Sequence, residues 1–390
     1  MLKTYLEGTH RTQSPEDTWS KIQPLLRSYG VTRVADVTGM DDIGISVTVA
    51  VRPLGRTLSV AQGKGTTLAA ARVSGAMEAI EVWHGEHAVP KAALRGPAES
   101  ANAPYPIAAL ESHPGSLVTP RTVLDWITAT SLADDTLVHV PRASVVLGRH
   151  RHSKWRLHLP SSSTNGLASG NTRAEAICHG LCELIERDVI SDLRTRGQAS
   201  DAERIAPETV TGPECAALLD KLTRARVWFE LWHLPNRFGV PVAVCYLWRE
   251  DQPTLLVSGS GAHVDPAVAL SRAITEAAQT RLTQIVGTRE DINPLAYRAG
   301  PSARPRHDPA PAVSWDEIAR RFTAFHATDD EEAAYLIKLV TDHAGHSPLA
   351  VELTRGRHAR HGLHVVKVLA PHLRYTARHT IPRPNLEVAA

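Results

Sequence analysis

Two kinds of hydrophobic pattern alternate along the chain. Runs of apolar and β-branched residues, bounded by Gly, Pro and polar turn residues, predict strands. These runs cover residues 31–38, 45–51, 57–61, 123–131, 136–147, 226–234, 241–248, 254–260, 348–354 and 363–369. Longer segments with an apolar residue every three or four positions predict helices. They cover residues 67–84, 172–196, 213–224, 266–282, 315–326 and 329–344.

The order of these elements predicts the fold class. Strands come in groups and helices come singly, which is typical of a mixed α+β fold with antiparallel sheets packed against helices. Residues 88–120 and 293–312 are rich in Pro and Ala, so we expect flexible insertions there, and we expect a turn at 161–171. We find no internal repeat and predict one domain over residues 1–390.

Composition narrows the range of partners. The chain has 43 Lys and Arg against 41 Asp and Glu, a net charge of +2, and neither sign forms a long block. This balance predicts no nucleic-acid or membrane partner. The first residues lack an apolar signal region, and no stretch approaches the roughly 20 apolar residues of a membrane span. Four cysteines are too few for a disulfide framework, so we expect a cytoplasmic protein.

The first two predicted helices each carry acidic side chains on one face. In the helix at 67–84, Ser74, Glu78 and Glu81 fall within roughly 60° of arc at ~100° per residue. In the helix at 172–196, Glu175, Glu183 and Glu186 fall within roughly 80° of arc, and Arg187 is adjacent.

The third helix, at 266–282, adds Glu276 and Gln279 one turn apart, whereas Arg281 points elsewhere on an ideal helix. Like charges at such spacing destabilise a helix unless a cation compensates them. Mg²⁺ is a hard cation that takes carboxylate oxygens and bridges phosphates, so the three faces indicate a phosphate and metal site. Ordinary solvated helix faces are the alternative that spacing alone leaves open.

Other catalytic motifs do not match. The segment QGKGTT (62–67) lacks the first glycine of a P-loop, and its Lys64 is followed by Gly instead of Ser or Thr. Cys178 and Cys182 lie one turn apart on a largely apolar helix, which is typical of small buried residues. Together with His179 they also lack the further ligands that a zinc site requires.

Three motifs in order resemble the YcaO family over nearly the whole chain. They are GKGTTLAAARVSGAMEAIE (63–81), TNGLASGNTRAEAICHGLCELIERDVI (164–190) and EAAQTR (276–281). The resemblance implies a YcaO-type fold around ATP and Mg²⁺. It implies Mg²⁺ ligands at Glu78, Glu81, Glu175, Glu183 and Glu186. It implies an ATP site of Arg11, Thr18, Ser74, Glu78, Asn171, Glu175, Glu183, Arg187, Glu276, Gln279 and Arg281, in which Arg187 contacts the phosphates.

The resemblance also implies a reaction. YcaO enzymes use ATP to phosphorylate the oxygen of a peptide backbone amide during maturation of ribosomally made peptides, after a nucleophile has added. Catalysis would then rest on positioning and charge neutralisation, without a protein nucleophile. The nucleophile can be sulfide, giving a thioamide, a Cys, Ser or Thr side chain, giving an azoline, or an amine, giving a macroamidine.

The opening segment YLEGTHRTQSPEDTW and residues 32–53 resemble stand-alone YcaO proteins, including those paired with TfuA proteins. The chain ends IPRPNLEVAA, without the Pro-x-Pro-x-Pro terminus of many azoline-forming members. We therefore rank thioamide formation first, with a precursor peptide as substrate and a separate TfuA-like or leader-binding partner. The interpretation allows a homodimer. An ATP-binding accessory protein for ribosomal-protein methylthiolation is the alternative of another class.

Overall fold

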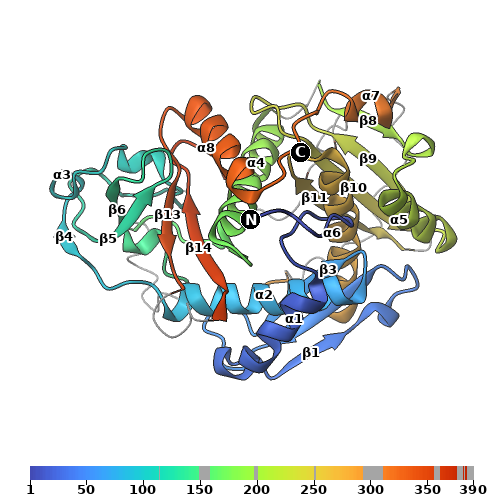
Figure 1. Cartoon of the computed structure of the whole chain (residues 1–390), viewed down its shortest axis with the longest axis horizontal. Coiled ribbons are helices and arrows are strands. Elements are labelled where there is room, and N and C mark those ends of the chain that lie inside the picture. Colours follow the sequence, from blue (N-terminus) through green and yellow to red (C-terminus); the bar gives the residue numbers. More distant parts are fainter. Residues whose placement is uncertain are drawn as a thin grey trace.

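The computed structural model describes residues 1–113, 115–148, 159–196, 201–249, 252–292, 311–354, 361–375, 381 and 383. Within these residues three sheets surround a group of central helices (Figure 1). The predicted α+β class with mainly antiparallel pairing is confirmed, since β8 and β12 are the parallel neighbours among the described strand pairs. Most of the expected insertion at 293–312 lies outside the described residues.

The N-terminal part forms a small antiparallel sheet with its own helices. The sheet comprises β1 (Arg33–Asp36), β2 (Ser46–Val51) and β3 (Val60–Gly65), in that order. The helical elements are α1 (Pro15–Ile22), η1 (Gln23–Tyr29), η2 (Thr38–Met40) and α2 (Leu68–His87). Helix α1 was not predicted, although Ser14 caps it by accepting from the Asp17 N–H and Pro15 occupies its first turn.

The segment that resembles a P-loop is the end of β3 and its turn into α2. Thr67 caps α2 by accepting from the Ala70 N–H. A Cβ on Gly63 would lie 2.1 Å from both the Ala71 carbonyl oxygen and the Gly75 nitrogen. Glycine is therefore required for the helix backbone to touch the strand, and this contact sets the position of Ser74, Glu78 and Glu81.

The second sheet has six strands. Its order is β4 (Leu94–Gly96), β5 (Leu124–Ser131), β13 (Leu349–Glu352), β14 (His364–Leu369) and β7 (Leu167–Gly170), and β6 (Leu137–Pro141) pairs with β5. Short helices α3 (Ala98–Ala101), η3 (Ile107–Ala109) and η4 (Arg142–Ser144) accompany it. Strand β7 lies where we expected only a turn, and the strand predicted at 136–147 ends at Pro141. Residues 88–120 include β4, α3 and η3, and they bury Tyr105, Ile107 and Leu110.

The third sheet has five strands and lies on the other side of the central helices (Figure 1). Its order is β11 (Gln252–Ala262), β10 (Val242–Arg249), β9 (Trp228–His233), β8 (Glu203–Ala206) and β12 (Ala312–Ser314). Its helices are η6 (Pro207–Thr209), α5 (Pro213–Arg224), α6 (Pro266–Val286) and α7 (Trp315–Ala319). The helix predicted at 315–326 ends at Ala319, since the chain leaves the helix after Arg320.

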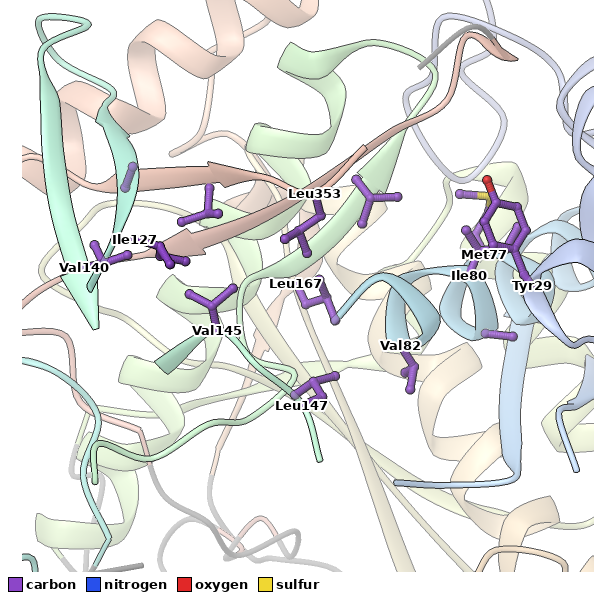
Figure 2. Packing of buried hydrophobic residues seen from close by; sticks show 14 of the residues in the cluster. Tyr29, Met77, Ile80, Val82, Ile127, Val140, Val145, Leu147, Leu167 and Leu353 are labelled. Atoms are coloured by element: carbon purple, nitrogen blue, oxygen red, sulfur yellow. The ribbon is translucent and has the colours of Figure 1, made fainter. Parts of the chain in front are cut away.

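Helices α4 (Arg173–Arg196) and α8 (Asp329–Ala344) stand between the two larger sheets (Figure 1). One apolar core links the six-stranded sheet to α2: in Figure 2 Leu167 and Leu353 lie between Ile127 on the sheet and Ile80 on the helix. Two further cores join α4 to the five-stranded sheet and α8, and α5 to α6. None of the described helices has the length and apolar character of a bilayer span.

Candidate active site

The three acidic helix faces belong to α2, α4 and α6, and hydrogen bonds link them to strands of all three sheets. The Gln62 N–H on β3 donates to Glu78 at 3.3 Å, and the Ser169 hydroxyl on β7 donates to Glu81. The Ser260 hydroxyl on β11 donates to Glu186 at 2.6 Å. Carboxylates that are distant in sequence lie close enough to interact, since the charge of Glu183 acts on both Glu78 and Glu81.

Three of these carboxyl groups resist ionisation. Burial raises the pKa of Glu78, Glu81 and Glu183, and that of Glu81 reaches about 8. Mutual repulsion adds to the effect, because the charge of Glu183 raises the pKa of both Glu78 and Glu81. A divalent cation bound between these groups would return them to the charged form.

Glu175 marks one end of the site, and its environment is the opposite. Arg11 Nη1 lies 3.0 Å from one of its oxygens, and the Thr12 hydroxyl donates to the other at 3.0 Å. Burial alone would raise the pKa of Glu175, but Arg11 and the donors from Thr12 and Asn171 outweigh it and lower the pKa. Asn171 in turn accepts from the Thr18 hydroxyl at 3.1 Å. The predicted nucleotide residues Arg11, Thr18, Asn171 and Glu175 thus form one connected group.

Arg187 lies at the other end of the α4 face. Its Nη2 is 3.7 Å from Glu183, and although burial lowers its pKa, the charges of Glu186, Glu183 and Glu276 raise it overall. Its Nε is buried without a hydrogen-bond partner in the described structure. A buried Nε–H without a partner is suited to donate to a phosphate oxygen, and the predicted contact of Arg187 with the phosphates stays a prediction.

The structure places the α6 residues individually. Glu276 forms an ion pair with Lys64, a residue that we had dismissed with the failed P-loop. The Lys64 N–H also donates to Ser74 Oγ at 3.4 Å. Arg281 points away from the acidic faces, because its Nε donates to Asp41 at 2.8 Å in a buried ion pair. Its role toward a nucleotide stays a prediction.

A second group of metal-type side chains lies beside the N-terminal segment. Ligand atoms of His10, His263 and Glu332 all lie within 4.8 Å of one another. Lys3 already pairs with Glu332, however, and the Asp265 N–H donates to His263 Nδ1 at 3.0 Å. The proton of neutral His263 must then occupy Nε2, the nitrogen nearest to Glu332, which opposes metal binding there.

We interpret this second group as a polar network that anchors the N-terminal segment. Leu2 pairs with Thr328, and the Lys3 N–H donates to the Ala327 carbonyl at 3.0 Å. The anchored segment then presents Arg11 and Thr12 to Glu175 (the marked N-terminus lies among the central helices in Figure 1). Sequence patterns did not reveal this arrangement, because its partners are more than 160 residues apart.

Carboxylates whose pKa is raised by burial, beside a guanidinium whose Nε has no hydrogen-bond partner among the described residues, suit a metal–phosphate complex and therefore a nucleotide-using protein. The comparisons with known proteins agree. The model of the family described as YcaO cyclodehydratase, ATP- and Mg²⁺-binding, matches residues 62–374. The chain belongs to the YcaO family and is an ATP- and Mg²⁺-dependent enzyme of the cyclodehydratase type.

The relatives extend over most of the chain. An uncharacterised protein of Mycobacterium tuberculosis is 36% identical over 375 residues, which cover 94% of this chain and 83% of that protein. An uncharacterised protein in the tfuA 3′ region of Rhizobium leguminosarum bv. trifolii is 35% identical over 301 residues, or 74% and 70% of the two chains. The structure of YcaO from Methanopyrus kandleri bound with AMPPCP and Mg²⁺ has a TM-score of 0.73 and 25% identity, over 99% of each chain.

Proposed function

We propose that this chain activates a backbone amide of a ribosomally made peptide for conversion to a thioamide, together with a separate TfuA-like partner. The family makes it an ATP-dependent enzyme of peptide backbone modification. The observation that carries the choice of thioamide is the 35% identity to a protein in a tfuA 3′ region. Neighbouring genes often encode proteins that act together, so this relative supports a TfuA-like partner for the present chain.

In this proposal the acidic faces hold Mg²⁺. Glu78, Glu81, Glu183 and Glu186 offer carboxylate oxygens from α2 and α4, and Glu175 adds one at the Arg11 end. The AMPPCP and Mg²⁺ bound to the Methanopyrus protein support this assignment. When bound, Mg²⁺ supplies charge neutralisation of the phosphates.

The remaining predicted residues would bind the nucleotide. Arg187 has a buried Nε that can donate to a phosphate oxygen. Arg11, Thr18 and Asn171 form the connected polar group at the Glu175 end. Further predicted contacts come from Ser74, Glu276, Gln279 and Arg281. Among these, Glu276 is compensated by Lys64 and Arg281 by Asp41, so both are positioned without a nucleotide.

The proposed reaction balances without a protein nucleophile. Hydrosulfide adds to the amide carbon, and the former carbonyl oxygen takes the terminal phosphoryl group of ATP. Cleavage of the carbon–oxygen bond then releases phosphate and leaves a carbon–sulfur double bond. Overall, amide, hydrogen sulfide and ATP give thioamide, ADP and phosphate. The chain contributes positioned carboxylates and guanidinium groups, which act by orientation and electrostatics.

Mass spectrometry of a precursor peptide tests the proposal. The peptide is one encoded beside the gene, incubated with the full chain, Mg-ATP and a TfuA-like protein, with and without sulfide. We expect a mass increase equal to exchange of one oxygen for one sulfur, only when sulfide and ATP are both present. Loss of one water without sulfide would contradict thioamidation and indicate an azoline or a macroamidine, which fragmentation distinguishes.

ATP hydrolysis tests whether the chain is an amide-activating enzyme at all, whatever product it forms. An amide-activating enzyme should hydrolyse ATP faster when the peptide is present. The amount of ATP hydrolysed in response to the peptide should be proportional to the amount of peptide modified. Binding of ATP without peptide-dependent turnover, with every neighbouring partner added, would contradict an enzymatic role and favour an accessory protein for methylthiolation.

A further inference from the structure

Most cations of the active site have a carboxylate partner. Arg11 pairs with Glu175 at 3.0 Å, and Arg187 lies 3.7 Å from Glu183. Lys64 pairs with Glu276. An additional cation of the site that has no carboxylate within ion-pair distance differs from these three.

Arg272 on α6 is such a cation. It lies one turn before Glu276, and its Nη2 donates to Nε2 of His179 at 3.3 Å. Across the described residues no carboxylate oxygen lies within 4.0 Å of its guanidinium. Its Nε is buried and makes no hydrogen bond within that part of the chain.

His179 does not balance this charge. Burial, together with the charges of Arg272, Arg11 and Lys64, holds its pKa well below the usual value, so the imidazole is neutral and its Nε2 accepts a hydrogen bond from the guanidinium. His179 also lies on the acidic face of α4, four residues after Glu175 and four before Glu183. At ~100° per residue these three side chains span roughly 80° of arc. The contact with His179 therefore places Arg272 beside the predicted Mg²⁺ ligands.

We propose that Arg272 binds the terminal phosphoryl group of ATP and holds it as it passes to the peptide oxygen; this inference rests on the proposed function. A guanidinium presents several donors in one plane and suits the oxygens of a phosphoryl group. The terminal group carries the most negative charge of the nucleotide, and Arg272 has no carboxylate oxygen within 4.0 Å among the described residues, unlike Arg11, Lys64 and Arg187. A partly buried guanidinium without a carboxylate would gain its counter-charge from this group.

Nucleotide binding tests the assignment without relying on activity. Affinities of the full chain are measured by calorimetry for the Mg²⁺ complexes of a non-hydrolysable ATP analogue, ADP and AMP, and for orthophosphate added to the ADP complex. The variants are Arg272→Met and Arg272→Lys. Arg173→Met is the matched control, because Arg173 lies on α4 but pairs with Glu352, away from the acidic face.

We expect Arg272→Met to weaken binding of the ATP analogue by roughly 10- to 100-fold, the effect of losing one or two charge-assisted hydrogen bonds. Affinity for ADP and AMP should stay within about 2-fold, and Arg272→Lys should be intermediate. If Arg272→Met also abolishes the binding of orthophosphate to the ADP complex, free phosphate occupies the same position as the terminal phosphoryl group.

Equal weakening for all three nucleotides would overturn the inference and assign Arg272 a structural role, as would unchanged affinity for the analogue. If Arg272→Met fails to fold, the analogue-to-ADP affinity ratio of Arg272→Lys decides, because lysine keeps the charge but loses the planar donors. Absence of Mg-nucleotide binding by the wild type would overturn the proposed function itself, and this inference with it.

Discussion

The N–H of Gly166 donates to Glu183 Oε2 at 3.0 Å. This bond joins the turn before β7 to the acidic face of α4 and fixes one of the predicted Mg²⁺ ligands. Gly166 has a φ of +73°, and a Cβ on it would lie 2.3 Å from the Val368 carbonyl oxygen. The turn can therefore take this shape only with glycine.

Replacing Gly166 with alanine should displace this N–H from Glu183. The left-handed backbone costs about 1–2 kcal/mol for alanine, and the contact with the Val368 carbonyl adds to that cost. We expect a lower melting temperature and weaker Mg-ATP binding, measured by thermal unfolding and calorimetry. Gly345→Ala is the matched control: its φ is +72°, but nothing lies within 4 Å of the added Cβ. Equal effects of both substitutions on Mg-ATP binding would contradict the role given to Gly166.

Lys367 also stabilises the turn that contains Gly166. It is 1% exposed, and its Nζ donates to the carbonyls of Ser163 and Asn165, both at 2.7 Å. Lys367→Met leaves these two carbonyls without a donor, which costs about 1–3 kcal/mol of stability. Because the turn also carries Gly166, we expect Mg-ATP affinity to fall by roughly 10-fold. Exposed Lys338→Met is the control, and unchanged Mg-ATP affinity in Lys367→Met would separate Lys367 from the site.

Replacing a predicted metal ligand should affect the stability of the free protein and of the Mg-ATP-bound protein in opposite directions. Burial raises the pKa of Glu183, so its charge is unfavourable without a cation. Glu183→Gln should therefore be at least as stable as the wild type without ligand, but should gain nothing from Mg-ATP. The wild type should gain about 2.7 kcal/mol at a ligand concentration of 100 Kd.

The control for this experiment is Glu208→Gln, whose side chain is exposed on η6. It should respond to Mg-ATP as the wild type does. Wild-type ligand stabilisation in Glu183→Gln, or in Glu186→Gln tested in parallel, would refute the metal-site assignment.

Sequence periodicity was sufficient for the helices that carry the site. The acidic faces of α2, α4 and α6 follow from 3.6-residue spacing alone, and the structure brings Glu78, Glu81 and Glu183 close enough to shift one another's pKa. Strand β7 was missed because its four residues, three of them small, form a strand only through pairing with β14, about 200 residues later. Local patterns contain no information about such a partner.

The residues that position the carboxylates were missed for the same reason. Thr12, Ser169 and Ser260 each donate to a site glutamate from a different part of the chain. Lys64 was set aside because its segment fails as a P-loop, although it pairs with Glu276. Helix α1, in contrast, could have been predicted, because Ser14 followed by Pro15 is a typical helix start.

Cys182 should be dispensable for catalysis. It is 3% exposed in an apolar part of α4, and burial raises its pKa to about 12, so it is a thiol at neutral pH. Cys182→Ala should keep peptide-dependent ATP hydrolysis and lose about 1 kcal/mol of stability from the small cavity. The measurements are ATP turnover with peptide and thermal unfolding. Loss of turnover with intact unfolding temperature and Mg-ATP affinity would indicate a catalytic thiol after all.

Asp329 should make the stability of the protein decrease as the pH rises from about 4 to 6. The residue is 2% exposed and accepts from the Thr172 hydroxyl at 3.0 Å. Burial, and then the charge of Glu175, raise its pKa to about 6. Its position in the first turn of α8 favours a carboxylate by only about 0.3–1 kcal/mol, so burial dominates.

The sign follows from proton binding. Between the unfolded pKa of about 4 and the folded pKa, the folded state binds more protons, so raising the pH destabilises it through this residue. Above pH 6 the full penalty is present, at most about 3 kcal/mol for this shift.

Asp329→Asn keeps an acceptor for Thr172 without the charge. Relative to the wild type it should therefore gain stability steadily from pH 4 to 6 and stay ahead above that. Chemical unfolding at several pH values measures the difference, with exposed Asp330→Asn as control. A constant difference between Asp329→Asn and the wild type across this range would show that Asp329 titrates like an exposed carboxylate.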